Sequence, residues 1–257
     1  MENDLLAAVA KIVYRSVKDF LAEIDGKRNV LEIEARLGKM AEKESGQRIY
    51  LPIASDAVIS PEEKDAYRFD PSLPDTLHKE YNRLLNTIVA ETARKGYVGD
   101  RVEYTHTRET DLFYKTQKGK VRKRVDTATQ KTVQIAHKKN LCTVDIYLPD
   151  SELDLRLSVA IEMALGQDPL ENSFLQRKKD RRSYTKENIR VDLSQTTQET
   201  GEGKREVHNE LELEWYDERA VEYLAGVEAG GAGLFMERLA GFLAKAVKIA
   251  KRKNIFI

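Results

Sequence analysis

Apolar and polar residues alternate with a period of two over much of this chain. The clearest stretch runs from Leu153 to Met163, where apolar residues occupy every second position and charged or small residues lie between them. Such alternation is typical of a β-strand with one buried face, because successive side chains point to opposite sides. The pattern recurs in shorter segments at 30–37, 121–125, 133–137, 142–148, 183–184 with 189–193, and 207–215. About seven or eight such strands indicate a β-sandwich or a β-barrel.

Three other segments are predicted to be helices. Their apolar residues recur at spacings of three and four, which gives each helix one apolar face. Pro74 suits the start of the second helix, and Gly96 suits its end. The predicted helices cover residues 1–26, 74–96 and 231–252.

The length and composition favour one soluble domain, 1–257. The chain is 41% hydrophobic, which is enough for a core, and it contains a single cysteine, Cys142. One cysteine excludes an internal disulfide and argues against structural zinc. No apolar run approaches the roughly 18–20 residues that cross a bilayer, so we expect no membrane association. Residues 38–72 are expected to form a loop with short strands.

Charge is balanced overall but uneven along the chain. Lys plus Arg number 43 and Asp plus Glu number 43, so bulk positive charge does not hold this protein on nucleic acid. Residues 177–190 carry seven bases against two acids, whereas residues 199–218 carry eight acids against two bases. Side chains from these two segments can meet if both fold into one sheet.

Two predicted strands concentrate carboxylates on one face. Glu32, Glu34 and Arg36 share a face of the strand 31–38, and three glutamates of the strand 210–214 share another. Solvated amphipathic strands are one interpretation. However, like charges on a strand face repel, so two such strands together favour a compensating divalent cation. Mg²⁺ or Mn²⁺ suits these oxygen ligands.

The basic residues also pair with a spacing of two, as in Lys179 with Arg181 and Arg122 with Arg124. If the polar strand faces point into a closed barrel, the apolar faces point outward and the three helices cover them. A lumen that contains carboxylates, Lys and Arg suits a polyanion such as a triphosphate. Phosphoryl transfer requires this kind of charge neutralisation, so we expect hydrolysis of a terminal phosphate.

Three stretches resemble a known family when they are taken in order: 31–38, 177–192 and 209–214. Together they resemble the metal-dependent RNA 5′-triphosphatases of fungal mRNA capping, which belong to the triphosphate tunnel metalloenzyme superfamily. The resemblance covers about Val30 to Trp215. It implies an α+β fold, a closed eight-stranded antiparallel β-barrel with a polar lumen, clad by amphipathic α-helices.

The resemblance also implies roles for individual residues. Glu32, Glu34 and Glu214 are expected to bind the metal, Mg²⁺ or Mn²⁺. The expected catalytic residues are Glu162, Glu212, Arg122 and Lys179. The expected substrate-binding residues are Arg122, Lys138, Arg156, Lys179, Arg181 and Arg190. The residues expected to brace the lumen by ion pairs are Asp111, Arg177, Asp192 and Glu210, whereas Arg124 and Lys178 are expected on the surface.

The implied reaction removes the γ-phosphate of 5′-triphosphate RNA and leaves a 5′-diphosphate end, which is the first step of mRNA capping. Metal-dependent NTP hydrolysis is expected as well. The alternatives are a tunnel-type tripolyphosphatase or NTPase that is not specific for RNA, and a non-catalytic polyphosphate-binding module. The implied partners are an mRNA guanylyltransferase and the RNA polymerase II transcription machinery, in the nucleus. A homodimer is also implied, for which the first helix and residues 254–257 offer apolar surface.

Overall fold

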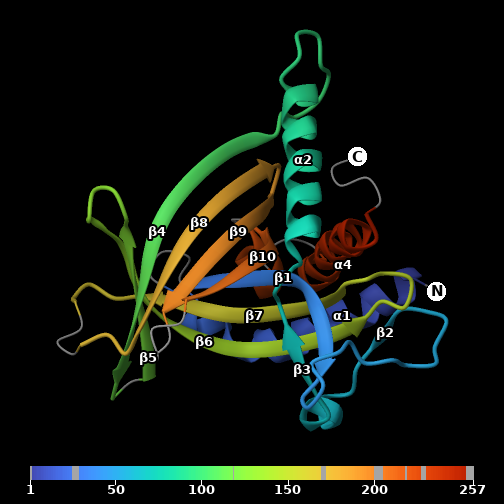
Figure 1. Ribbon diagram of the computed structural model, residues 1–257. Helices are drawn as coiled ribbons and strands as arrows, with labels where there is room; N and C mark the ends of the chain where they lie inside the picture. The colour runs from blue at the N-terminus through green and yellow to red at the C-terminus, as the bar shows by residue number, and fades with distance from the viewer. Residues whose placement is uncertain are drawn as a thin grey trace.

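The computed structural model describes residues 2–24, 29–117, 119–168, 172–199, 205–217, 219–226 and 230–252. Within them, eight antiparallel strands form a closed barrel, which confirms the predicted fold class (Figure 1). Around the barrel the strands follow the order β10-β9-β8-β4-β5-β6-β7-β1, and β1 pairs with β10 to close it. The strands are β1 (Asn29–Glu42), β4 (Glu103–Thr116), β5 (Gly119–Asp126), β6 (Thr132–Tyr147), β7 (Asp154–Ala164), β8 (Leu175–Lys186), β9 (Ile189–Glu199) and β10 (Arg205–Trp215).

Helices pack on the outside of the barrel. α1 (Glu2–Val17), which continues into the 3₁₀ helix η1 (Lys18–Glu23), contacts β6, and α4 (Gly231–Ala250) contacts α1, β1 and β7. α2 (Asp75–Thr92) stands beside β9 and β10 in Figure 1. A short helix, α3 (Ala220–Ala225), packs on α4. No described helix has the length and apolar character that crossing a membrane requires.

The hydrophobic core lies between these helices and the outer faces of the strands. In β7, Leu155, Leu157 and Val159 point outward and are fully buried, as the period of two requires. Trp215 packs its ring 5.5 Å from that of Phe235 in α4. The barrel is therefore apolar outside, where the helices cover it, and polar inside.

The segment 38–72 forms a flap at one end of β1. It contains β2 (Ala57–Val58), the 3₁₀ helix η2 (Pro61–Asp65) and β3 (Tyr67–Asp70), in agreement with the predicted loop with short strands. β3 pairs with the end of β1, and Gly38 makes this approach possible. A Cβ atom at Gly38 would lie 2.3 Å from the carbonyl oxygen of Asp70.

The structure differs from the predicted elements in several places. The segments 133–137 and 142–148 belong to one strand, β6, in which the register shifts between Asn140 and Cys142. β4 was not predicted, because its first half lacks apolar alternation. α2 covers one end of β8, where the buried Tyr184 donates to Asn82 and Asn86, but elsewhere on the outer faces of β4 and β8 Asp180 forms exposed pairs with His106 and Arg108. Residues 26 and 254–257, which were predicted to end a helix and to offer apolar surface, lie outside the described residues.

Candidate active site

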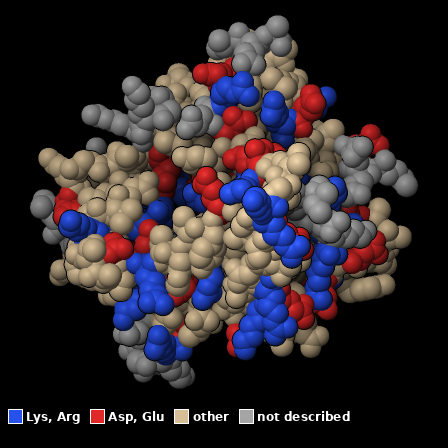
Figure 2. All heavy atoms as spheres, turned by 90° about the horizontal axis from the view of Figure 1, so that it is seen from above, with Lys and Arg blue, Asp and Glu red and all other residues tan. Residues whose placement is uncertain are grey.

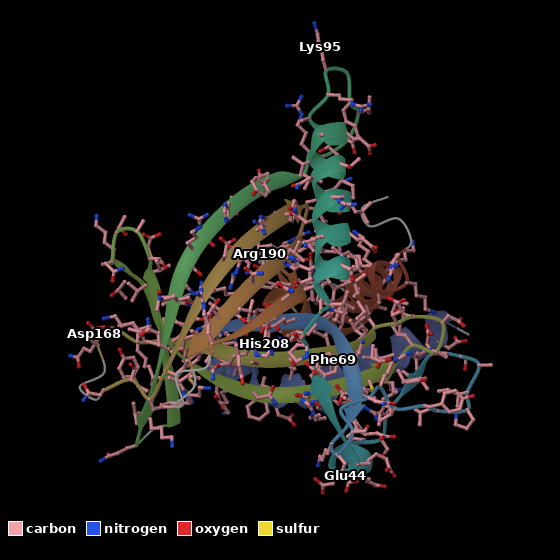
Figure 3. All side chains as sticks on the ribbon, viewed as in Figure 1. Glu44, Phe69, Lys95, Asp168, Arg190 and His208 are labelled. Atoms are coloured by element: carbon pink, nitrogen blue, oxygen red, sulfur yellow. The ribbon has the colours of Figure 1, made fainter. Side chains whose placement is uncertain are left out.

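The inward faces of all eight strands line one polar lumen. The pairing register links these faces around the barrel, since Glu34 lies opposite Glu214, Glu214 opposite Arg190 and Arg122 opposite Phe113. Figure 3 shows side chains from facing strands filling the enclosed space, with Arg190 among them. Both signs of charge are also mixed over the face seen in Figure 2. The predicted site residues thus come from all eight strands and meet inside the barrel, except where noted below.

Three glutamates form a cluster at the junction of β1 and β10. Glu34 and Glu214 are register partners across this junction, and Glu32 lies two residues before Glu34 on the same face of β1. Lys138 forms ion pairs with Glu32 and, at 3.4 Å, with Glu34, whereas Arg190 pairs with Glu214. Burial, together with the nearby Glu212, raises the pKa of Glu34. Burial, together with Glu32, raises the pKa of Glu214 to about 7 despite the opposing effect of Arg190. Arg36 forms a further ion pair with Glu34, so each of the three glutamates has a cationic partner.

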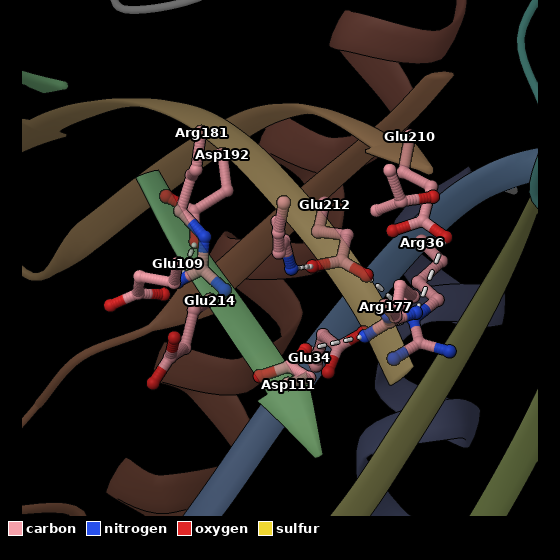
Figure 4. A network of polar contacts seen from close by, with 12 residues as sticks. Glu34, Arg36, Glu109, Asp111, Arg177, Arg181, Asp192, Glu210, Glu212 and Glu214 are labelled. Carbon is pink, nitrogen blue, oxygen red and sulfur yellow. Dashed lines mark hydrogen bonds and ion pairs between the residues drawn. The ribbon is translucent and has the colours of Figure 1, made fainter. Parts of the chain in front are cut away.

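Glu212 is the central carboxylate of the network in Figure 4. It lies 3.0 Å from Nε of Arg36 and 3.7 Å from Nζ of Lys179. Burial alone would raise its pKa, but Lys179 and Arg36 lower the pKa well below the usual range of a glutamate. Burial lowers the pKa of Lys179 in turn. The pKa values of Glu34 and Glu212 are thus shifted in opposite directions.

Arg177 and Asp111 brace the β4–β8 wall of the lumen. The Arg177 guanidinium donates to Asp111 at 3.1 Å and lies 3.8 Å from Glu210 on β10. Although burial opposes ionisation of Asp111, Arg122 and Arg177 lower its pKa. The negative charge of Asp111 therefore stabilises two of the lumen's arginines.

Asp192 joins two further arginines on the β8–β9 side. Arg181 and Arg190 each approach Asp192 at 3.2 Å. In Figure 4, Arg181, Asp192 and Glu214 lie on one side of Glu212, whereas Arg36, Arg177 and Glu210 lie on the other. The lumen thus has two ends with different charged groups.

Glu162 lies where β7 faces β5. It forms an ion pair with Arg122 and accepts a hydrogen bond of 3.1 Å from Gln134. A cavity of 250 Å³ opens at this place, and its lining includes Arg122, Lys138 and Glu162. A space beside a carboxylate and two cations suits a phosphate group and a water molecule.

Arg156 differs from the other predicted substrate-binding residues. Its guanidinium donates two hydrogen bonds of 2.6 and 2.7 Å to Asp145 and lies 4.6 Å from the centre of the Phe69 ring. Tyr67 also donates to Asp145, at 2.7 Å. These contacts anchor β3 over one end of the barrel, and they occupy the face of Arg156 that a phosphate would use.

The sequence analysis did not identify three lining residues. Arg124, predicted on the surface, points into the lumen and lies 3.6 Å from Glu109, so that prediction was wrong. The spacing of two from Arg122 was the available signal. Glu109 and Gln134 carried no signal, because Glu109 belongs to the polar half of β4 and Gln134 is a neutral side chain.

The cluster of Glu32, Glu34 and Glu214 fits a hard divalent cation. Its donors are all carboxylate oxygens, and the pKa values of Glu34 and Glu214 are raised, chiefly by burial and also by the neighbouring glutamates. Within the described ranges, no three His, Cys, Asp or Glu side chains already surround a common point. Lys138 pairs with Glu32 and Glu34 there, and Arg190 pairs with Glu214.

Comparison with known proteins decides the family. The sequence profile of the family described as "mRNA capping enzyme, beta chain" matches residues 1–254. The chain belongs to this family. It is therefore an RNA 5′-triphosphatase of mRNA capping, and the predicted function is confirmed. Capping implies a nuclear role, and triphosphatases of the tunnel type typically depend on a metal ion.

Individual capping-enzyme beta chains are moderately similar. The mRNA-capping enzyme subunit beta of Schizosaccharomyces pombe is 28% identical over 77% of this chain and 68% of its own length. The subunit of Yarrowia lipolytica is 28% identical over 75% of this chain, which spans about half of that longer protein, 48%. The solved structure of the S. pombe Pct1 RNA triphosphatase superposes with a TM-score of 0.81 at 24% identity, covering 96% of this chain and 94% of that one. It has also been solved in complex with the Spt5 CTD. At this identity the likeness supports the barrel fold.

Proposed function

We propose that this beta chain removes the γ-phosphate of 5′-triphosphate RNA inside the barrel, leaving a 5′-diphosphate end. The observation that carries the proposal is the closed lumen, in which a cluster of three glutamates lies beside Lys and Arg side chains from several strands. A triphosphate matches both the glutamate cluster and the Lys and Arg side chains, because its oxygens coordinate a metal and also accept hydrogen bonds from cations. Nascent RNA then becomes the substrate of a guanylyltransferase.

Glu32, Glu34 and Glu214 are proposed to hold the metal, Mg²⁺ or Mn²⁺. When bound, a divalent cation neutralises charge on the phosphate oxygens. With the cation held by the three glutamates, Lys138 and Arg190 would be free to contact the substrate. These two cations occupy the cluster in the meantime and limit the repulsion among the glutamates.

The phosphate contacts are assigned to Arg122, Lys138, Lys179, Arg181 and Arg190. Lys179 and Arg181 lie two residues apart on the inward face of β8, and Arg122 lies on the inward face of β5, with β4 between the two strands. We assign the γ-phosphate to Lys179 and Arg122, because each already lies near a carboxylate that can position water, namely Glu212 and Glu162. Charge that develops on the transferred group is then balanced from two sides.

We assign to Glu212 and Glu162 the positioning of the attacking water. The low pKa of Glu212 keeps this side chain ionised, so it accepts a hydrogen bond from water and orients the oxygen toward phosphorus. The new bond joins the water oxygen to the γ-phosphorus, and the bond between the γ-phosphorus and the bridging oxygen breaks. The β-phosphate takes the electron pair, and the water proton passes to the carboxylate or to bulk solvent. The products are inorganic phosphate and diphosphate-ended RNA.

The remaining predicted residues are given positioning roles. Asp111, Arg177, Asp192 and Glu210 hold the cationic side chains in place through the ion pairs described above. Arg156, whose guanidinium is bound by Asp145, is assigned to fixing β3 at the barrel end.

Other substrates and partners belong to the same proposal. NTP and tripolyphosphate have the same triphosphate group, so an enzyme not specific for RNA is the second candidate. A binding module without catalysis is disfavoured, because such a module has no use for the carboxylates that line the lumen. The Spt5 CTD bound to the S. pombe protein supports contact with the RNA polymerase II machinery. A guanylyltransferase and a second copy of this chain complete the proposed assembly.

The test measures phosphate release from γ-labelled 5′-triphosphate RNA with Mg²⁺, Mn²⁺ or a chelator. Wild-type protein should release the γ-phosphate only with metal, and Glu32→Ala and Glu214→Ala should lose about 100-fold or more. Asp180→Ala is the matched control, since Asp180 lies on the outer face of the same strand as Lys179, and its exposed ion pairs contribute little. Equal activity with chelator, or full activity of both glutamate variants, would refute the proposal.

A further inference from the structure

The hairpin of β4 and β5 extends the inward face of the barrel beyond the lumen. Side chains two apart share a face, so Phe113 and Lys115 of β4 continue the line of Asp111, and Lys120 of β5 continues the line of Arg122. In the register, Phe113 lies opposite Arg122 and Lys115 lies opposite Lys120. The hairpin lies on the side of the barrel away from α2 (Figure 1).

Lys115 and Lys120 face one another without a carboxylate. Like charges directly opposite on paired strands destabilise a sheet. Neither lysine forms a salt bridge with any residue in the described part of the chain, and both are exposed. Burial and the nearby Arg177 lower the pKa of Lys120, as expected where positive charge is in excess. An anion from outside the chain would remove this cost.

Two aromatic rings lie beside these lysines. The amide of Phe174 donates to the carbonyl of Phe113 at 2.9 Å, which places the two residues side by side at the start of β8. Nζ of Lys120 lies 4.3 Å from the centre of the Phe113 ring, and Nζ of Lys115 lies 5.3 Å from that of Phe174. The Phe174 side chain is 47% exposed. Exposed aromatic rings next to cations are the elements of a single-stranded nucleic-acid site, where bases stack and phosphates are bound.

This surface connects directly to the proposed triphosphate site. The cavity of 250 Å³ beside Glu162 is lined by Phe113 and Lys120 as well as by Arg122 and Lys138. At the other end of the lumen the arginines that the structure describes have carboxylate partners, since Arg181 and Arg190 pair with Asp192 and Arg124 with Glu109. The end with unpaired positive charge is therefore the one beside the β4–β5 hairpin.

We propose that Lys115, Lys120, Phe113 and Phe174 bind the first nucleotides of a single-stranded RNA whose 5′-triphosphate lies in the lumen. This inference rests on the proposed function and adds the site at which RNA is distinguished from a free triphosphate. The two lysines contact the phosphodiester groups that follow the triphosphate. The Phe174 ring stacks on a base, which works for any base sequence, as an enzyme acting on all nascent transcripts requires.

The test compares kcat/KM for a 5′-triphosphate RNA of ten nucleotides with that for inorganic tripolyphosphate under the same metal. The double variant Lys115→Ala/Lys120→Ala should lower the ratio of the two values about tenfold or more. The slope of log kcat/KM for RNA against log salt should also decrease in magnitude by about 1.4, because each contact to a single-strand phosphate contributes about 0.7. Phe174→Ala should lower the ratio by about tenfold without altering the slope, because stacking is not an ionic contact.

A charge-matched control is available on α2 and in the turn that follows it. Lys79 and Lys95 are both exposed, and Figure 3 shows Lys95 at the tip of α2, beyond the barrel. Lys79→Ala/Lys95→Ala should keep the wild-type ratio and salt slope. If the ratio of the two kcat/KM values were unchanged both in Lys115→Ala/Lys120→Ala and in Phe174→Ala, the inference would be overturned. The proposed function would still be supported if the wild-type protein hydrolysed the RNA. If wild-type protein released phosphate from neither substrate, the proposed function itself would fail.

Discussion

The negative charge that Glu214 needs as a metal ligand destabilises the folded chain when no metal is bound. Burial, with Glu32 adding to it, raises the pKa of Glu214 to about 7 from an ordinary value of 4.5. Between these two values the folded chain binds more protons than the unfolded chain, so this residue makes stability fall as the pH rises toward 7. Above that pH, an ionised Glu214 destabilises the metal-free fold.

Glu214→Gln should therefore stabilise the metal-free protein at pH 8 and leave it nearly unchanged at pH 4.5. The expected gain is about 1–3 kcal/mol, because a pKa difference of one unit corresponds to 1.36 kcal/mol. Arg190 keeps Asp192 as a partner in the variant, at 3.2 Å. Thermal unfolding in the presence of a chelator at the two pH values measures the effect. A variant less stable than wild type at pH 8 would contradict it.

At the scale of elements, strands whose two faces differ were predictable and strands with two polar faces were not. β7 and β10 show apolar residues on one face and charges on the other, so both the strand and its orientation could be read from the sequence. The first half of β4 is polar on both faces, because no helix covers its outer side, and it was missed together with Glu109. Arg156 shows a further limit, since its pairing with Asp145 depends on the register of β6 and β7, and Tyr67 and Phe69 of the flap reach this pair from a distant part of the chain.

The contact of β1 with β3 gives a prediction at this scale. Gly38→Val should destabilise the fold by about 1–3 kcal/mol, because the added side chain overlaps the backbone of Asp70 and forces the strands apart. Gly241 in α4 is the matched control, since a Cβ atom there has no neighbour within 4 Å. Gly241→Ala should stabilise by about 0.5–1 kcal/mol, as expected for a glycine within a helix. Urea denaturation compares both variants, and equal stability for Gly38→Val and wild type would rule out the tight approach.

At the scale of the whole molecule, the proposed metal site lies on the strand pair that closes the barrel. Glu34 belongs to β1 and Glu214 to β10, which are neighbours in the barrel but lie at opposite ends of the barrel sequence. A cation bound by both would act as a non-covalent link across this junction. Binding that is specific to the folded state stabilises it by mass action.

Hydrogen–deuterium exchange should detect this link. Adding Mn²⁺ should slow exchange of the amides of β1 and β10 more than that of the amides of β4, which is not part of this junction. Glu214→Gln should remove the difference, whereas Asp180→Ala should keep it. Uniform protection of all strands by Mn²⁺, or protection that persists in Glu214→Gln, would show that the ion binds elsewhere.

The position of the hydrophobic core outside the barrel separates two kinds of evolutionary constraint. Leu155, Leu157 and Val159 hold the fold together on one face of β7, whereas the alternate positions of the same strand face the lumen and make no part of that core. A lumen residue can therefore be exchanged for another polar residue without the loss of buried apolar surface. Natural selection can then adapt the substrate preference of such a barrel one side chain at a time while the scaffold stays the same.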